Sequence, residues 1–124
     1  MLLDTSCWIE YFKGTGKGEK LKERMENQEV FYTCPITIAE ISVWCHKNNK
    51  LPKDFITSIK KLSVMMDMSE DILAESGRIY HEERKRNGKI GLIDCMIYAT
   101  AQMHELVLLT KDTDFKNLKD VKIL

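Results

Sequence analysis

Short apolar runs alternate with longer amphipathic segments along this chain. The apolar runs predict β-strands at residues 1–4, 30–34, 62–66, 106–110 and 121–124. The segments between them predict helices at residues 6–12, 19–28, 37–47, 69–87 and 92–104, with another helix opening at Leu51-Pro52. The Gly-rich stretch at residues 14–18 is predicted to be a flexible loop.

Local signals support several of these boundaries. Pro52 suits the first turn of a helix, where a backbone N–H is not needed. Ser69 followed by Glu70 and Asp71 is typical of a helix N-terminus, because the hydroxyl caps the free N–H groups and the acids favour the helix dipole. Asn87-Gly88 ends that helix.

The alternation of strands and helices predicts an α/β fold in three layers, with helices on both faces of a mainly parallel central sheet. The run Leu106-Val-Leu-Leu suits a strand that is buried on both faces. No repeat, low-complexity tract or linker divides the sequence, so residues 1–124 are predicted to form a single domain.

The composition is that of an ordinary globular protein, with 44% hydrophobic and 31% charged residues. No apolar run approaches the ~20 residues of a membrane span, and the opening residues do not resemble a signal peptide. The cysteines occur in apolar contexts without a C-x-x-C pair, which predicts small buried residues in a reducing cytoplasm and not disulfides or a zinc site. They are Cys7, Cys34, Cys45 and Cys95.

Four carboxylates each stand where a short apolar run meets a turn or a helix. Asp4 and Asp112 follow predicted strands, whereas Glu40 and Asp94 lie near the starts of predicted helices. In α/β folds, sites form beyond the carboxyl ends of the strands, near a switch in strand order. We therefore expect these four side chains to meet in one pocket.

A pocket of this kind needs a cation, because like charges disfavour joint ionisation where solvation is poor. A hard divalent ion such as Mg²⁺ or Mn²⁺ prefers oxygen ligands and resolves the repulsion. Metal-assisted phosphodiester chemistry is therefore the leading hypothesis, since a bound ion activates water and stabilises charge on phosphate oxygens.

The charge balance fits an anionic polymer as partner. The chain has 19 basic and 19 acidic residues. Setting aside the four carboxylates and Asp114 leaves 14 acidic residues against 19 basic ones, a surplus of five positive charges. A basic cluster just before Asp94 is a candidate for phosphate contact, although such a cluster is usually only a solvated helix end. Its members are Arg84, Lys85, Arg86 and Lys89.

Each acid also has a purely structural explanation. Glu40 lies three residues after Thr37, so the two can form a helix capping box. Asp94 near a helix start favours the dipole, and Asp112 and Asp114 can cap the turn into Phe115.

Other enzyme classes fit less well. The pair Asp112-Thr-Asp114 is similar to a phosphatase motif, but only ten residues follow it. The Gly14–Gly18 stretch follows no strand and does not end in Gly-Lys-Ser/Thr, which argues against nucleotide binding. The histidines have no nearby partners that would form a catalytic triad.

Four segments together resemble the motifs of the PIN-domain family, and specifically of the VapC-type toxin ribonucleases of prokaryotic toxin–antitoxin modules. They are Leu3-Asp-Thr-Ser-Cys-Trp-Ile, Thr37-Ile-Ala-Glu-Ile, Gly91-Leu-Ile-Asp-Cys-Met-Ile-Tyr-Ala-Thr-Ala and Leu109-Thr-Lys-Asp-Thr-Asp-Phe. Any single segment is a weak signal, but the four occur in order over essentially the whole chain.

The resemblance implies roles for individual residues. Asp4, Asp94 and Asp112 would bind Mg²⁺ or Mn²⁺, and Glu40 would be a further ligand or a base that orients water. Thr5 and Thr110 would support the pocket with their hydroxyls, and Asp114 would be a fifth acid.

The resemblance also implies partners. RNA would be hydrolysed to 5′-phosphate and 3′-hydroxyl ends. The protein would form a homodimer and bind a VapB-like antitoxin that occludes the site, with an antitoxin Arg or Lys among the carboxylates. Trp8, Phe12 and Trp44 would help to anchor the antitoxin or would pack in the core. Two alternatives stay open: a PIN scaffold that binds RNA or a protein without turnover, and an RNA-processing nuclease with no toxin role.

Overall fold

The computed structural model describes all residues from Met1 to Leu124. Its strands are β1 (Leu2–Leu3), β2 (Tyr32–Thr33), β3 (Val64–Met65), β4 (Leu108–Thr110) and β5 (Val121–Ile123). Its helices are α1 (Thr5–Lys13), α2 (Gly16–Glu26), α3 (Pro35–Lys47), α4 (Pro52–Leu62), α5 (Glu70–Arg86) and α6 (Leu92–Met103), with a 3₁₀ turn, η1 (Thr113–Phe115). Each predicted strand and helix is found, although the strands are shorter than their apolar runs.

The five strands form one parallel sheet in the order β3-β2-β1-β4-β5. The chain moves outward from β1 through β2 to β3, and then returns to place β4 on the other side of β1. The strand order therefore reverses between β1 and β4, which is where ligand sites form in doubly wound folds.

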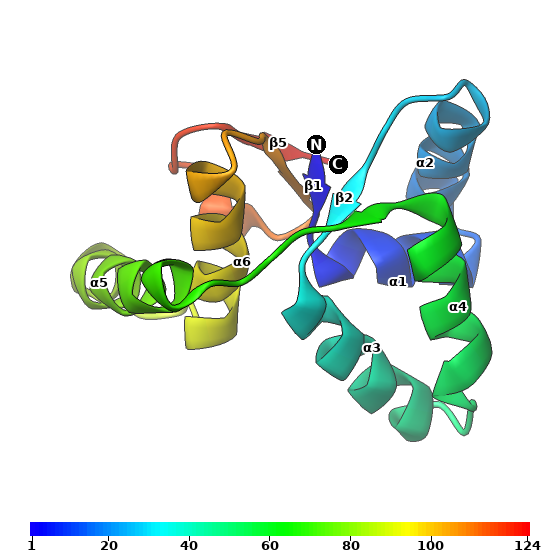
Figure 1. The fold of residues 1–124 in the computed structure, drawn as a ribbon, viewed down its shortest axis with the longest axis horizontal. Coiled ribbons are helices and arrows are strands. Elements are labelled where there is room, and N and C mark those ends of the chain that lie inside the picture. The colour runs from blue at the N-terminus through cyan, green and yellow to red at the C-terminus, as the bar shows by residue number, and fades with distance from the viewer.

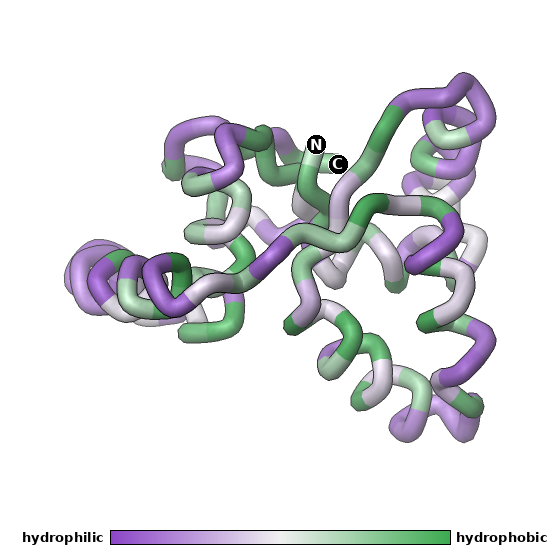
Figure 2. The backbone as a smooth tube through the Cα atoms, in the orientation of Figure 1, coloured by the Kyte–Doolittle hydropathy of each residue, from purple (hydrophilic) through white to green (hydrophobic).

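Helices cover both faces of the sheet, as predicted (Figure 1). Because side chains alternate along a strand, Leu2 and Leu108 enter a buried cluster with α5 and α6, whereas Leu3 and Leu109 enter a second cluster with α1 to α4. Figure 2 shows hydrophobic residues along the central strands and hydrophilic residues over much of α2. The three-layer α/β/α prediction is confirmed.

The Gly-rich stretch is not the flexible loop that the sequence suggested. Gly14, at φ 65°, ends α1, and the Thr15 hydroxyl accepts a hydrogen bond from the Gly18 N–H at 3.1 Å to begin α2. Gly18 packs so closely on α1 that a Cβ there would lie 2.0 Å from the Glu10 carbonyl oxygen. The glycines therefore allow two helices to turn sharply and pack together.

The capping-box explanation for Thr37 and Glu40 is wrong. Helix α3 begins at Pro35, two residues before the predicted start, because proline fits the first helical position. Thr37 is fully buried inside the helix, and no side chain caps its N-terminus. By contrast, the predicted cap of α5 is confirmed, since the Ser69 hydroxyl accepts from the Ile72 N–H.

All four cysteines are buried and free, as expected from their apolar neighbours. None of the helices combines the length and apolar character needed to cross a bilayer.

Candidate active site

The site lies at the carboxyl edge of β1 and β4, the two strands that flank the switch in strand order. Asp4 follows β1 and is only 5% exposed, and Asp112 follows β4 by two residues. The Thr110 hydroxyl links them, because it donates to Asp4 Oδ2 at 2.8 Å and accepts from the Asp112 N–H at 3.0 Å. The parallel pairing of these strands thus brings together acids that are 108 positions apart.

Glu40 reaches the site from the second turn of α3. The Thr5 hydroxyl, at the start of α1, donates to Glu40 Oε1 at 2.6 Å and lies 3.1 Å from the buried Thr37 hydroxyl. Burial raises the pKa of Glu40 above its usual value, and the Asp4 carboxylate adds to this, while the Thr5 hydrogen bond opposes it. Glu40 therefore holds a proton more readily than an ordinary glutamate.

Asp94 lies in the first turn of α6. Its Oδ2 accepts a hydrogen bond from the Gly91 N–H at 3.1 Å, so the proposed favourable role at a helix start is real. Burial raises the pKa of Asp94 to about 6, and the charges of Asp4, Asp112 and Glu40 act in the same direction. The influence of these three carboxylates on Asp94 is the electrostatic signature of a shared pocket.

These four carboxylates line one cavity of about 230 Å³, together with Thr5, Ser6 and Ile9. No lysine, arginine or histidine lines it. Each carboxylate uses one oxygen in hydrogen bonds to the protein, and its other oxygen has no protein partner. The free atoms are Asp4 Oδ1, Glu40 Oε2, Asp94 Oδ1 and Asp112 Oδ2.

Ser6 belongs to the same constellation, although the sequence did not single it out. Its hydroxyl donates to Asp4 Oδ2 at 2.7 Å and accepts from the Lys111 N–H at 3.1 Å. Ser6 therefore helps to orient Asp4 and joins α1 to the segment after β4. The spacing of Asp4 and Ser6, two residues apart, was the available signal, since a serine so placed readily bonds a nearby side chain or backbone group.

The structure separates Asp114 from the other acids. Its N–H donates to Asp112 Oδ1 at 2.8 Å, and its carbonyl oxygen accepts from Asn87 at 3.4 Å. Its side chain does not line the cavity. Asp114 thus fixes Asp112 through the backbone at the start of η1, and Asp112 also caps this turn as the structural explanation predicted.

The basic cluster also lies outside the cavity lining. Arg84 donates to the Ile90 carbonyl oxygen at 3.1 Å and lies over the Tyr80 ring, so it holds the loop that leads into α6. Lys85 and Arg86 pair with Glu82 and Glu83 one helical turn away. Lys89 is exposed and its ammonium has no side-chain partner.

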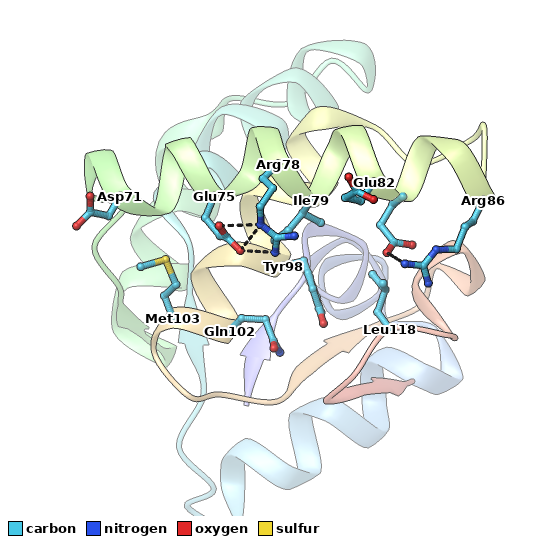
Figure 3. Close-up of a pocket in the computed structure, with 11 residues that line it drawn as sticks. Asp71, Glu75, Arg78, Ile79, Glu82, Arg86, Tyr98, Gln102, Met103 and Leu118 are labelled. Carbon is cyan, nitrogen blue, oxygen red and sulfur yellow. Dashed lines mark hydrogen bonds and ion pairs between the residues drawn. The ribbon is translucent and has the colours of Figure 1, made fainter.

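A larger cavity, of about 770 Å³, lies between α5 and α6 (Figure 3). Its carboxylates differ from those of the site, because Glu75 pairs with Arg78 and Glu83 pairs with Arg86. Tyr98 and Met103 of α6 contribute to its lining. We call this cavity the α5–α6 groove.

The donor set of the acidic cavity fits a hard divalent ion. Four oxygens are without protein partners and no cationic side chain neutralises them. Burial, and after it the neighbouring carboxylates, raise the pKa values of Glu40 and Asp94, and a bound ion would oppose both effects. No three His, Cys, Asp or Glu side chains lie close enough together to form a complete set of metal ligands on their own. Mg²⁺ does not need one, because it usually binds through one or two carboxylates and keeps several waters.

The sequence matches the PIN domain family over residues 1–121. This chain is a PIN-domain protein. The four motifs that suggested the family are those that supply the four carboxylates of the cavity.

Individual relatives agree with this assignment. Ribonuclease VapC11 of Mycobacterium tuberculosis is 29% identical over 125 aligned positions, covering 93% of this chain and 88% of the relative. A toxin–antitoxin complex from Klebsiella pneumoniae contains a chain with 27% identity and a TM-score of 0.77, covering 98% of this chain and 94% of that one. FitAcB from Neisseria gonorrhoeae has 26% identity and a TM-score of 0.69, covering 99% and 95%. The resemblance to VapC-type proteins is confirmed.

Proposed function

We propose that this protein is a Mg²⁺- or Mn²⁺-dependent endoribonuclease and the toxin of a toxin–antitoxin pair. One observation carries the metal-dependent reaction: four carboxylates from four separate parts of the chain line one cavity without a cation, each with a free oxygen. RNA is the proposed substrate because the similar VapC11 protein is a ribonuclease.

Asp4, Asp94 and Asp112 are the proposed metal ligands. Asp4 is the most rigidly held, since Thr110 and Ser6 both donate to its Oδ2, and its Oδ1 would be free to bind the ion. Asp94 and Asp112 are oriented by backbone N–H groups at the starts of α6 and η1. When bound, the ion lowers the pKa of a coordinated water and stabilises charge on the phosphate oxygens.

Glu40 is the proposed base for the attacking water. The Thr5 hydroxyl fixes Oε1, and Oε2 is available to accept the proton. Its raised pKa suits this role, because a base works best when its pKa is near the working pH. Oxygen from water then bonds to phosphorus while the bond to the 3′ oxygen breaks, and the released 3′ oxygen takes a proton from solvent, which leaves 5′-phosphate and 3′-hydroxyl ends.

Purified protein without a partner should therefore cleave total RNA when Mg²⁺ or Mn²⁺ is present, and EDTA should stop the reaction. Binding of RNA without cleavage under all metal conditions would instead support a non-catalytic PIN scaffold. End-labelling of the products distinguishes 5′-phosphate from 5′-hydroxyl termini, and the proposal requires the former.

The proposed antitoxin is a VapB-like protein that blocks this cavity with an arginine or lysine. Arginine suits the task because its planar guanidinium pairs with two carboxylate oxygens at once. Changing that one antitoxin residue to Ala should weaken inhibition strongly while other contacts persist. Unchanged inhibition and affinity would place the block outside the carboxylates. A homodimer and a cytoplasmic location are part of the same proposal.

A further inference from the structure

A second cavity, of about 260 Å³, adjoins the acidic one. Ser6, Ile9 and Asp112 line both cavities, so the two share a wall. The second cavity is completed by Glu10 and Lys13 of α1 and by Lys111 of the segment after β4. We call it the lysine cavity.

The two cavities carry different charges. The acidic cavity has four carboxylates and no cation, whereas the lysine cavity has two ammonium groups, those of Lys13 and Lys111, beside the carboxylates of Glu10 and Asp112. Asp112 belongs to both, and the proposed metal would neutralise it. Because Glu10 is paired with Lys111 and Asp112 would be bound to the metal, Lys13 leaves a surplus of positive charge in the adjoining space, next to an RNA phosphate among the carboxylates.

Lys111 is held in place before any ligand arrives. Its Nζ lies 2.5 Å from Glu10 Oε1, and Glu10 is only 5% exposed. The Thr15 hydroxyl also donates to the Glu10 carboxylate, which fixes it from the other side. A free lysine side chain loses considerable rotamer freedom on binding, so this pairing removes part of that loss in advance.

The pairing leaves binding capacity unused. A lysine ammonium has three N–H donors, and the structure gives one of them to Glu10. Lys13, in the last turn of α1, is exposed and makes no side-chain hydrogen bond or ion pair. Its charge nonetheless reaches Glu10 and helps to lower the pKa of that carboxyl, after the larger effects of Lys111 and Thr15. The ammonium groups of Lys13 and Lys111 thus both line one cavity and have N–H donors that make no hydrogen bond to the protein.

We infer that the lysine cavity is a phosphate subsite, in which Lys111 and Lys13 bind the RNA phosphate next to the one that is cleaved. The inference rests on the proposed ribonuclease function. Glu10 is a positioning residue, because it acts on the phosphate only by holding Lys111. The subsite would hold the neighbouring phosphate at the wall that Ser6, Ile9 and Asp112 form between the two cavities.

The experiment measures binding of a fluorescein-labelled single-stranded oligoribonucleotide at several salt concentrations, by fluorescence anisotropy. Asp94→Asn serves as the background in every variant so that the RNA is not consumed. Lys13→Gln and Lys111→Gln should each weaken binding on the order of tenfold at low salt and lower the slope of log K against log salt by about 0.7. Lys111→Arg should retain most of the affinity. Lys60→Gln, an exposed lysine of α4 outside the site, is the matched control.

A second arm locates the phosphate. A neutral methylphosphonate replaces, one at a time, the phosphate on either side of the cleaved bond. At one of the two positions it should weaken binding to the protein with both lysines, and should cause no further loss when both are glutamine. If the methylphosphonate weakened RNA binding equally at the two phosphate positions, the assignment of the subsite would be wrong.

Failure of this inference is distinguishable from failure of the proposed function. If the wild-type protein cleaves RNA but both lysine variants bind like Lys60→Gln, the subsite is wrong and the nuclease stands. If the wild-type protein cleaves no RNA with either metal, the function itself is wrong. Thermal melts of Lys111→Gln identify any loss of affinity that comes from unfolding, and Lys13→Gln, which breaks no ion pair, tests the subsite without that complication.

Discussion

The acidic cavity and the α5–α6 groove both contain four acidic residues, yet they are built in opposite ways. In the groove, Glu75 pairs with Arg78 and Glu83 with Arg86, one helical turn apart on α5. In the acidic cavity, the carboxylates come from four separate parts of the chain and no cation lies among them. The groove is about three times larger in volume, at about 770 Å³ against about 230 Å³.

The difference shows which charges are available for chemistry. Neighbouring charges on one helix arise readily from sequence and neutralise each other in solvent, where such pairs contribute little to stability. Like charges gathered by the fold from distant parts of the chain remain unneutralised, and burial together with these neighbouring carboxylates raises the pKa values of Glu40 and Asp94. The larger cavity is therefore not the one whose charges fit a metal ion.

The largest expected effect is on catalysis. Asp94→Asn should lower RNA cleavage by roughly a thousandfold, because loss of a metal ligand removes several kcal/mol of charge stabilisation from the transition state. Asparagine can still accept the Gly91 hydrogen bond, so α6 keeps its N-terminal contact. The measurement is the cleavage rate at saturating Mg²⁺ or Mn²⁺.

The matched control is Glu75→Gln in the groove. It removes the same charge from a carboxylate that is paired on the surface of α5, and we expect an unchanged rate. If Glu75→Gln lowered the cleavage rate as much as Asp94→Asn, the unpaired carboxylates of the acidic cavity would not be the ones that matter for cleavage.

The next effect is on thermal stability. Mg²⁺ or Mn²⁺ at about 100 times its Kd should stabilise the protein by about 2.7 kcal/mol, or roughly 10 °C in Tm, because the ion binds only the folded cluster. Asp4→Asn should remove this response and raise the Tm of the metal-free protein, since it relieves repulsion. If millimolar metal leaves the Tm of the wild type unchanged, and Asp4→Asn only destabilises, the acids have a structural role.

A smaller effect should appear in the pH dependence of the metal-free protein. Asp94 has a pKa of about 6 in the fold against 3.8 for an ordinary aspartate, so the folded state binds its proton more tightly than the unfolded state. This contribution to stability is present below about pH 4 and is lost as the pH rises to about 6.

The test compares wild type and Asp94→Asn by thermal melts in EDTA across this pH range. The variant should gain stability relative to the wild type as the pH rises, because its side chain does not ionise. Other titrating groups largely cancel in the comparison. A relative gain by the wild type over the same range would contradict the shared-pocket electrostatics.

The sequence was sufficient to predict the parallel sheet and the meeting of Asp4, Glu40, Asp94 and Asp112. Buried strands leave continuous apolar runs, and the carboxyl ends of parallel strands meet at one edge. The four acids could therefore be recognised in the sequence, because each stands next to apolar residues.

The remaining parts of the site depend on tertiary contacts that no local pattern contains. Ser6 matters through the N–H of Lys111, 105 positions away. Glu10 lies among apolar residues of α1, but only the fold reveals that it is buried against Lys111. The Gly-rich stretch failed as a prediction for the same reason, since the close approach of Gly18 to Glu10 exists only in the packed structure.

The smallest expected effect separates two members of the basic cluster. Lys89 has no side-chain partner, whereas Arg86 faces Glu83 in the α5–α6 groove. If, within this cluster, the charge without an acidic neighbour is the one that meets RNA, Lys89→Gln should lower the slope of log K against log salt by about 0.7, as expected for one lost contact to a single strand. Arg86→Gln should leave the slope unchanged.

Anisotropy titrations of an oligoribonucleotide on the Asp94→Asn background measure both, and metal affinity should not change in either variant. Equal slopes for both variants and their parent would return the whole cluster to a solvated helix end, and a larger change for Arg86→Gln would make the groove part of the RNA path.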